Sequence, residues 1–173
     1  MHSCEMPNGN YWGRRTGEAA INSLSAKDMI GIIEYNWQGG DNWVHPITEV
    51  GDKASALRSI NSLTYGDAPS FDTMLTDAYQ GLKKAAAGQK HIIIISDGDP
   101  QQNDQNLINN FVAAKISVST VAVYPHTYGN ASADLNRMRR IARLTGGRYY
   151  EITNATGGLN NLPEIFIKEA RTI

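Results

Sequence analysis

The chain has 173 residues, of which 41% are hydrophobic, and a formal net charge of −1 from 16 basic and 17 acidic side chains. This length suits one well-buried domain over residues 1–173, and the balanced charge gives no electrostatic reason to expect nucleic acid as a partner. The single cysteine excludes an internal disulfide and a cysteine-based structural metal site. No apolar stretch approaches the roughly 20 residues that cross a bilayer, so we expect no direct membrane insertion of this segment.

Predicted helices and strands alternate along the chain, with apolar residues at helical or strand spacing and turn residues between them. In chain order, we expect a loop at 1–12, a helix at 14–24, a strand at 29–35, a turn at 38–42, a strand at 43–47, helices at 52–63 and 72–88, a strand at 91–95, a helix at 104–112, a strand at 117–123, a helix at 135–144, a strand at 148–152 and a helix at 162–170. The turn at 38–42 predicts a hairpin, and therefore one antiparallel edge strand. This alternation predicts an α/β sandwich with a mostly parallel sheet.

Helix ends have their own signals in this sequence. Asp52, Asp72 and Asp104 are each predicted to cap the helix that follows. Gly146 and Gly147 close the helix at 135–144, where a left-handed residue is easiest to place.

The stretch at residues 91–100 contains four consecutive isoleucines that end on polar residues. A run that is apolar at every position suits a strand covered on both faces, as in the middle of a parallel sheet. Ligands of open α/β sheets bind beyond the carboxyl ends of the strands. Ser96, Asp97 and Asp99 therefore mark a candidate binding site.

Three segments carry motifs that are specific when taken together. They are Ile94-Ile-Ser-Asp-Gly98, the strand at 117–123, and Leu144-Thr-Gly-Gly-Arg-Tyr-Tyr150 followed by Leu162-Pro-Glu-Ile-Phe166. With these motifs the chain resembles the von Willebrand factor A (vWA) family over essentially its whole length, and most closely the bacterial members found in large, often membrane-anchored proteins. The resemblance implies a three-layer αβα, doubly wound, Rossmann-like fold.

The resemblance also implies a metal-ion-dependent adhesion site at the carboxyl edge of the sheet. The family's first motif is Asp-x-Ser-x-Ser, and in this chain Met1 falls on the Asp position, Ser3 matches the first serine and Glu5 replaces the second. The third motif supplies Asp97. The implied metal ligands are therefore Ser3, Glu5 and Asp97, for Mg²⁺ or another divalent cation.

The family's second motif, a threonine in a glycine-rich loop, falls in residues 66–71, where Pro69 occupies the threonine position. These departures favour binding through the same surface without a metal. Asp67, Ser70 and Asp99 are the residues that we expect to contact the partner. The implied function is a non-catalytic interaction module whose partner is another protein or another domain of the parent chain, and the parent is implied to be membrane-anchored or part of the cell envelope.

The family places its first strand at the centre of the sheet, beside the strands at 29–35 and 91–95. This sequence has only a few residues ahead of its first loop, so we expect the first central strand to be largely missing and the chain to be an N-terminally truncated piece of a larger protein. A gap at that place would expose unpaired backbone groups. The isolated chain is then expected to be marginally stable, oligomeric or swapped.

Asp97-Gly-Asp99 after an apolar strand also resembles the nucleophile loop of haloacid-dehalogenase-like phosphatases. In that alternative, Asp97 would attack phosphorus with Mg²⁺ as cofactor, and Asp99 would act as the general acid and base. Pro100 and Gln101 replace the expected hydroxyl residue, and the motif lies in the middle of the chain, so the interaction module is the preferred interpretation.

The last predicted helix is amphipathic. Its apolar stripe is expected to pack on the sheet, with Lys168 and Glu169 outside the stripe. The stripe consists of Leu162, Ile165, Phe166 and Ala170.

Overall fold

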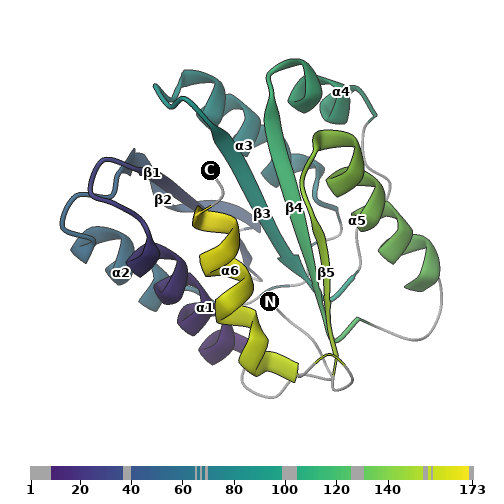
Figure 1. Ribbon diagram of the computed structural model, residues 1–173, viewed down its shortest axis with the longest axis horizontal. Helices are drawn as coiled ribbons and strands as arrows, with labels where there is room; N and C mark the ends of the chain where they lie inside the picture. Colours follow the sequence, from purple (N-terminus) through teal and green to yellow (C-terminus); the bar gives the residue numbers. More distant parts are fainter. Residues whose placement is uncertain are drawn as a thin grey trace.

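The computed structural model describes residues 9–36, 40–64, 66, 68, 70–98, 105–125, 131–153, 156 and 158–171. In chain order, its elements are α1 (Gly9–Ser23), β1 (Met29–Asn36), β2 (Gly40–Glu49), α2 (Ala54–Asn61), α3 (Asp72–Lys84), β3 (Lys90–Ser96), α4 (Gln105–Ala113), β4 (Ile116–Val123), α5 (Ala131–Thr145), β5 (Tyr149–Ile152), a short 3₁₀ helix η2 (Gly158–Asn161) and α6 (Leu162–Arg171). Figure 1 shows this order from purple to yellow, with helices packed around the strands. Among the described helices, none is long and apolar enough to span a membrane.

The described strands form two sheets. β1 and β2 pair antiparallel, with Met29 opposite Glu49. β3, β4 and β5 pair parallel in that order, with Lys90 opposite Ile116. The predicted α/β class, the parallel sheet and the antiparallel edge strand are therefore confirmed.

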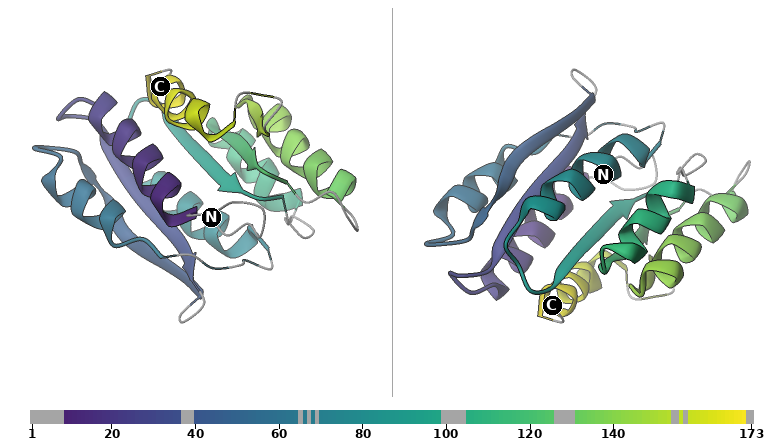
Figure 2. Two further views of the ribbon diagram at one scale, coloured as in Figure 1. Left: turned by 90° about the horizontal axis from the view of Figure 1, so that it is seen from below. Right: turned by 90° about the horizontal axis from the view of Figure 1, so that it is seen from above.

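Helices cover both faces of the strands, which gives three layers (Figure 2). On one face, α1 and α2 pack on β1, and α6 packs on β4 and β5. On the other face, α3, α4 and α5 pack on β3 and β4. This arrangement is the doubly wound one that the alternating sequence predicts.

β4 lies at the centre of the hydrophobic core and is buried at every position but one. Successive side chains of a strand point to opposite faces of a sheet. Val118 and Ala122 accordingly join the cluster under α3, α4 and α5. Val121 and Val123 join the cluster under α6.

The helix ends agree with the sequence only in part. Asp52 Oδ1 accepts a hydrogen bond from the backbone N–H of Ala54 at 3.0 Å, as expected for a capping residue. The prediction for Asp72 is wrong, because Asp72 is the first residue of α3 and its own N–H donates to Ser70 Oγ at 3.1 Å. The predicted cap Asp104 lies outside the described residues.

Two further boundaries depend on local chemistry. α1 begins at Gly9, so the loop predicted over residues 1–12 is wrong for residues 9–12. Gly146 has a φ of +78°, which confirms the left-handed residue expected at the end of α5. A Cβ on Gly147 would lie 2.1 Å from the carbonyl oxygen of Val118, so this close approach of two backbones requires glycine.

No described strand lies between β1 and β3, which belong to separate sheets. This is the place where the sequence predicted a largely missing central strand, and that expectation is confirmed for the described part of the chain. The two sheets are connected instead through helices, since α1 packs against α6 and α3 packs against α4.

Candidate functional site

Asp97 directly follows β3 and is only 8% exposed. The backbone N–H of Gly98 donates a hydrogen bond to Ser96 Oγ at 3.2 Å. Gly98 has a φ of +105°, a conformation that glycine adopts readily and other residues rarely do. This tight turn fixes Asp97 at the carboxyl end of β3, where the sequence places the binding chemistry.

The other predicted site residues are distributed as follows. Ser70 is half-buried and accepts the hydrogen bond from Asp72 described above, so its hydroxyl holds the start of α3. The loop that carries Ser70 contributes Gly66 and Ala68 to the same cavity that Asp97 lines. The loop and Asp97 thus border the same cavity. The remaining candidates lie outside the described residues; they are Ser3, Glu5, Asp67 and Asp99.

Glu34 is a second carboxylate on this cavity that the sequence analysis missed. Its Oε2 accepts a hydrogen bond from the backbone N–H of Thr64 at 2.9 Å, and its Oε1 accepts one from Asn36 Nδ2 at 3.0 Å. Its position in the sequence could have indicated this role, because Glu34 is the only charged residue of β1 and lies near the carboxyl end of that strand.

The described residues do not form a metal centre by themselves. No group of three or more His, Cys, Asp or Glu side chains among them is placed to hold a metal ion. Mg²⁺ prefers six oxygen ligands in near-octahedral geometry. The described residues therefore do not supply a complete set of protein ligands for a metal at Asp97.

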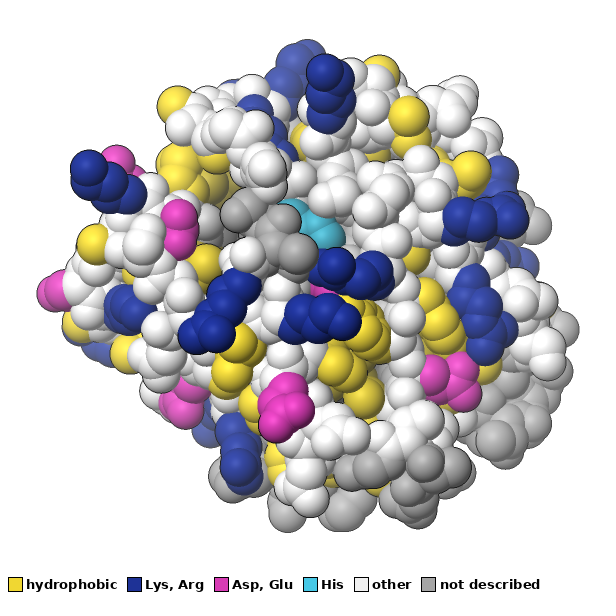
Figure 3. All heavy atoms as spheres, viewed as in Figure 1, with side chains coloured by type: hydrophobic (Ala, Val, Ile, Leu, Met, Phe, Trp, Pro, Cys, Tyr) yellow, Lys and Arg dark blue, Asp and Glu magenta, His cyan; other side chains and the backbone are white. Residues whose placement is uncertain are grey.

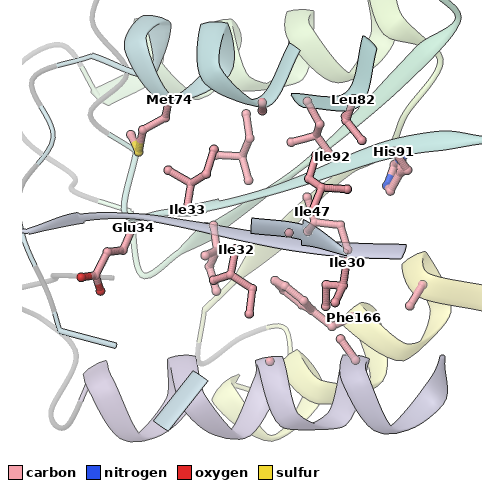
Figure 4. Close-up of a pocket in the computed structure, with 18 of the residues that line it drawn as sticks. Ile30, Ile32, Ile33, Glu34, Ile47, Met74, Leu82, His91, Ile92 and Phe166 are labelled. Atoms are coloured by element: carbon pink, nitrogen blue, oxygen red, sulfur yellow. The ribbon is translucent and has the colours of Figure 1, made fainter. Parts of the chain in front are cut away.

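A cavity of about 870 Å³, here called the slot, separates β1 from β3. Its size lies toward the upper end of the roughly 300–1,000 Å³ that is usual for ligand pockets. Figure 4 shows Ile30, Ile32 and Ile33 of β1 between Met74 and Leu82 of α3 on one side and Phe166 of α6 on the other. Asp97 and Glu34 line the slot together with these apolar side chains.

A polar cluster lies away from the predicted site, around the side chain of Glu169 on α6. It is called the Glu169 cluster here and consists of Glu169, His91, Ser119, Arg148 and Tyr150. The Glu169 side chain is 0% exposed. Its Oε2 accepts hydrogen bonds from His91 Nε2 at 3.0 Å and Ser119 Oγ at 2.5 Å, and its Oε1 accepts them from Arg148 Nε at 2.6 Å and Tyr150 Oη at 2.5 Å.

Burial and hydrogen bonding set the protonation states in this cluster. Burial lowers the pKa of His91 below its ordinary 6.5, although Glu169 acts in the opposite direction. Burial alone would raise the pKa of Glu169, but the hydrogen bonds from Arg148, Ser119 and Tyr150 outweigh it and hold that pKa below its ordinary value. Burial, and then the hydrogen bond to Glu169, raise the pKa of Tyr150 to about 12.

The hydrogen bonds of the Glu169 cluster hold α6 on the sheet and engage the polar groups of the cluster with one another. With His91 neutral, Nε2–H donates to Glu169 and Nδ1 accepts a hydrogen bond from Ser117 Oγ at 2.6 Å, so both ring nitrogens are engaged. A smaller cavity of about 360 Å³ borders the cluster. The prediction that Glu169 lies outside the buried stripe of α6 is wrong, because donors on β3, β4 and β5 converge on its carboxylate.

The fold and the carboxyl-edge site define a doubly wound α/β domain of the Rossmann-like class. The model of the von Willebrand factor type A domain matches residues 15–165, and the chain belongs to this family. Domains of this family generally act as non-enzymatic interaction modules. No curated protein is significantly similar to the chain.

Several solved structures share the fold. A von Willebrand factor type A protein from Catenulispora acidiphila is 16% identical, with a TM-score of 0.74 over 93% of this chain and 37% of that protein. The chain thus spans little more than a third of that relative. An aerotolerance-related membrane protein from Bacteroides fragilis is 16% identical, with a TM-score of 0.65 over 97% of this chain and 90% of that one. The vWF domain of the type V pili tip protein Mfa5 from Porphyromonas gingivalis is 14% identical, with a TM-score of 0.64 over 94% and 86%.

Proposed function

We propose that this vWA domain is a non-catalytic protein-interaction module that binds its partner through the loops at the carboxyl edge of the sheet. The observation that carries the proposal is the placement of Asp97: a buried carboxylate, fixed by a tight turn after β3, on the cavity shared with the loop that precedes α3. In open α/β sheets this edge is where ligands bind. The partner is another protein or another domain of the parent chain.

The proposed contact residues are Asp67, Ser70 and Asp99. The proposal is for binding without a metal, since the first family motif departs from its pattern at Met1 and Glu5. If a divalent cation does bind, Ser3, Glu5 and Asp97 are the residues that would hold it. Glu5 would then add a negative charge and weaken the attraction for an acidic partner residue.

Two relatives support the cellular setting that we propose. One is described as a pilus tip protein and another as a membrane protein. By this likeness of fold, the parent protein is proposed to be membrane-anchored or part of the cell envelope, with this domain outside the lipid.

The face of the molecule shown in Figure 3 fits a protein partner better than a polyanion. Basic side chains are spread over this face, with acidic and hydrophobic side chains between them, and do not form one continuous patch. Nucleic acid binding depends on a concentrated positive surface that neutralises phosphates.

The test uses the wild-type chain, Asp97→Asn and, as a matched control, Asp77→Asn at an exposed position of α3. A partner that is captured by wild type and by the control, and lost with Asp97→Asn, supports the carboxyl-edge surface. Capture that does not depend on Asp97 contradicts it.

Two further measurements separate the alternatives. Calorimetric titration of the chain with Mg²⁺, Mn²⁺ and Ca²⁺ is expected to give no heat of binding at millimolar concentration, whereas binding that is lost in Asp97→Asn would establish a metal site. Turnover of phosphate esters with Mg²⁺ that is abolished by Asp97→Asn would replace the interaction module by the phosphatase.

A further inference from the structure

We propose that the smaller cavity, beside the Glu169 cluster, binds a small phosphorylated molecule whose phosphate group is held by Lys90 and Lys115. This cavity is called the amino-edge cavity here, because it lies at the amino ends of the parallel strands. The inference does not rest on the carboxyl-edge function, since neither Ser70 nor Asp97 lines the amino-edge cavity.

The turns that precede β3, β4 and β5 meet around the amino-edge cavity. They contribute residues 88–90, 115 and 146–148 to its lining. Because the three strands run parallel, these turns lie at one edge of the sheet, opposite the edge of Asp97 (Figure 1). The volume of about 360 Å³ lies near the lower end of the roughly 300–1,000 Å³ that is usual for ligand pockets, so the cavity suits a small molecule.

The charges around the amino-edge cavity do not balance. Its lining contains one carboxylate, that of Glu169, and three cationic side chains, which are Lys90, Lys115 and Arg148. Arg148 and Glu169 form an ion pair at 2.6 Å, and His91 is neutral at pH 7 because burial lowers its pKa. Within the described part of the chain, no carboxylate pairs with Lys90 or Lys115. The cavity therefore carries two positive charges that an anion can neutralise.

The two lysines are close enough to bind one anion. Lys90 is paired with Ile116 in the ladder between β3 and β4, so Lys115 is next to the pairing partner of Lys90. Paired strands are about 4.8 Å apart, and the side chain of lysine is long and rotatable. Two positive charges match the charge of about −1.5 to −2 that a phosphate monoester carries at pH 7, whereas a monoanion such as acetate would leave one of them unmatched.

The backbone of Lys115 independently indicates that its side chain is required. Lys115 follows α4 and has a φ of +55°, in the left-handed region that favours glycine. After α5, which also leads into a strand of the sheet, the left-handed residue is Gly146. A side chain at such a position has a steric cost that glycine avoids, and strain of this kind concentrates at functional sites. The retention of a lysine at this place therefore points to a role for its ammonium group.

Calorimetric titration with glycerol 3-phosphate tests the proposal, with acetate and glycerol as controls. We expect saturable binding of glycerol 3-phosphate with a Kd of about 1 mM or lower, at least tenfold weaker binding of acetate, and no heat of binding with glycerol. The affinity should fall as the NaCl concentration rises, because salt screens partly exposed charges. In an NMR titration, the amide signals of residues 88–91, 115–119 and 146–148 should shift, and those of residues 96–98 should not.

Variants of Lys115 separate binding from stability. Lys115→Gly removes the ammonium group and the steric cost together, so it should weaken binding at least tenfold without lowering Tm. Lys115→Gln keeps a side chain at positive φ and removes only the charge, and it should weaken binding to the same extent. Lys53→Gly is the matched control, because Lys53 also has a positive φ, of +68°, but lies at the start of α2 and does not line the cavity. Its affinity should equal that of the wild-type chain.

The proposal is overturned if glycerol 3-phosphate does not bind at millimolar concentration, or if both variants of Lys115 bind it as the wild-type chain does. Equal weakening by Lys53→Gly would also overturn it, because the attraction would then depend only on the net charge. If the Lys115 variants do not fold, Lys90→Gln decides, and it should weaken binding at least tenfold.

Two further probes identify the source of the phosphate group. If inorganic phosphate or acetate binds as tightly as glycerol 3-phosphate, the cavity holds an adventitious ion only. If a phosphoserine peptide binds at least tenfold more tightly than glycerol 3-phosphate, the occupant is a phosphorylated protein and the assignment to a small molecule is wrong.

Discussion

Replacing Glu169 with glutamine removes the charge at the centre of the Glu169 cluster and keeps the shape of the side chain. Four donors reach the wild-type carboxylate, from His91, Ser119, Arg148 and Tyr150. Hydrogen bonds to a charged acceptor stabilise by about 1.5–3 kcal/mol each, and bonds between neutral groups by about 0.5–1.5 kcal/mol. Each bond should therefore weaken by about 1 kcal/mol.

Two effects make the total loss smaller than the sum over the four hydrogen bonds. A neutral amide costs less to bury than a carboxylate, and the side chain of Arg148 is 40% exposed, so solvent screens its part of the interaction. We expect Glu169→Gln to lower the free energy of unfolding by about 2–3 kcal/mol at pH 7. For a chain of 173 residues, this corresponds to a fall in Tm of about 5–10 °C.

Urea unfolding followed by tryptophan fluorescence, at a series of pH values, measures this difference. The pKa of Glu169 is lowered in the folded state, so its contribution is present above its unfolded pKa of about 4.3 and is lost as the pH falls through the folded-state pKa. The gap between wild type and Glu169→Gln should therefore be largest near pH 7 and shrink below about pH 4. Glu164→Gln, at an exposed position of the same helix, is the matched control and should change stability by less than about 0.5 kcal/mol.

A loss below about 0.5 kcal/mol for Glu169→Gln at pH 7 would mean that the carboxylate does not hold α6 on the sheet. A large loss that stays the same down to the lowest pH would show that shape, and not charge, is responsible.

Three further changes test other parts of the structure. Phe166→Ala should lower the free energy of unfolding, measured with urea, by about 1–3 kcal/mol. This is less than the roughly 3–5 kcal/mol expected for a fully buried ring, because Phe166 is half-buried on the slot. A decrease of about 4 kcal/mol or more would mean that the slot is closed in solution. Gly147→Ala should lower the free energy of unfolding by more than about 3 kcal/mol, because the added Cβ meets the backbone of Val118. Gly146→Ala, in open space at positive φ, should lower it by only about 1 kcal/mol. Equal effects of the two substitutions would contradict the close approach at Gly147. By NMR, the pKa of His91 should lie below 6.5, and it should fall further in Glu169→Gln because Glu169 raises it. The stability that is linked to His91 is then present above pH 6.5 and is lost as the pH falls through the folded-state pKa. A measured pKa of His91 above 6.5 would refute this.

The order of elements could be predicted because each is encoded locally. The four isoleucines of β3, the turn residues after β1 and the glycines after α5 each specify their own segment without reference to the rest of the chain. The position of Asp97 followed in turn from the rule that parallel strands end at one edge of the sheet.

The role of Glu169 could not be predicted in this way. A helical pattern separates apolar from polar positions, and on that basis Glu169 belongs on the solvent side of α6. Its burial depends on donors that lie 78, 50 and 21 residues away in the sequence, at His91, Ser119 and Arg148. Only the tertiary arrangement of three strands places those donors together. Glu34 is similar, because its bond to Thr64 joins residues 30 positions apart.

The absence of a ladder between β1 and β3 has a mechanical consequence. A force that pulls β2 away from β5 passes through the side-chain contacts of α1 with α6 and of α3 with α4, and no ladder between the described strands resists it. Side-chain contacts between helices separate one by one, whereas the bonds of a sheet loaded along its strands must break together. Under tension, the β1–β2 half and the β3–β4–β5 half should therefore separate at low force, before either ladder breaks.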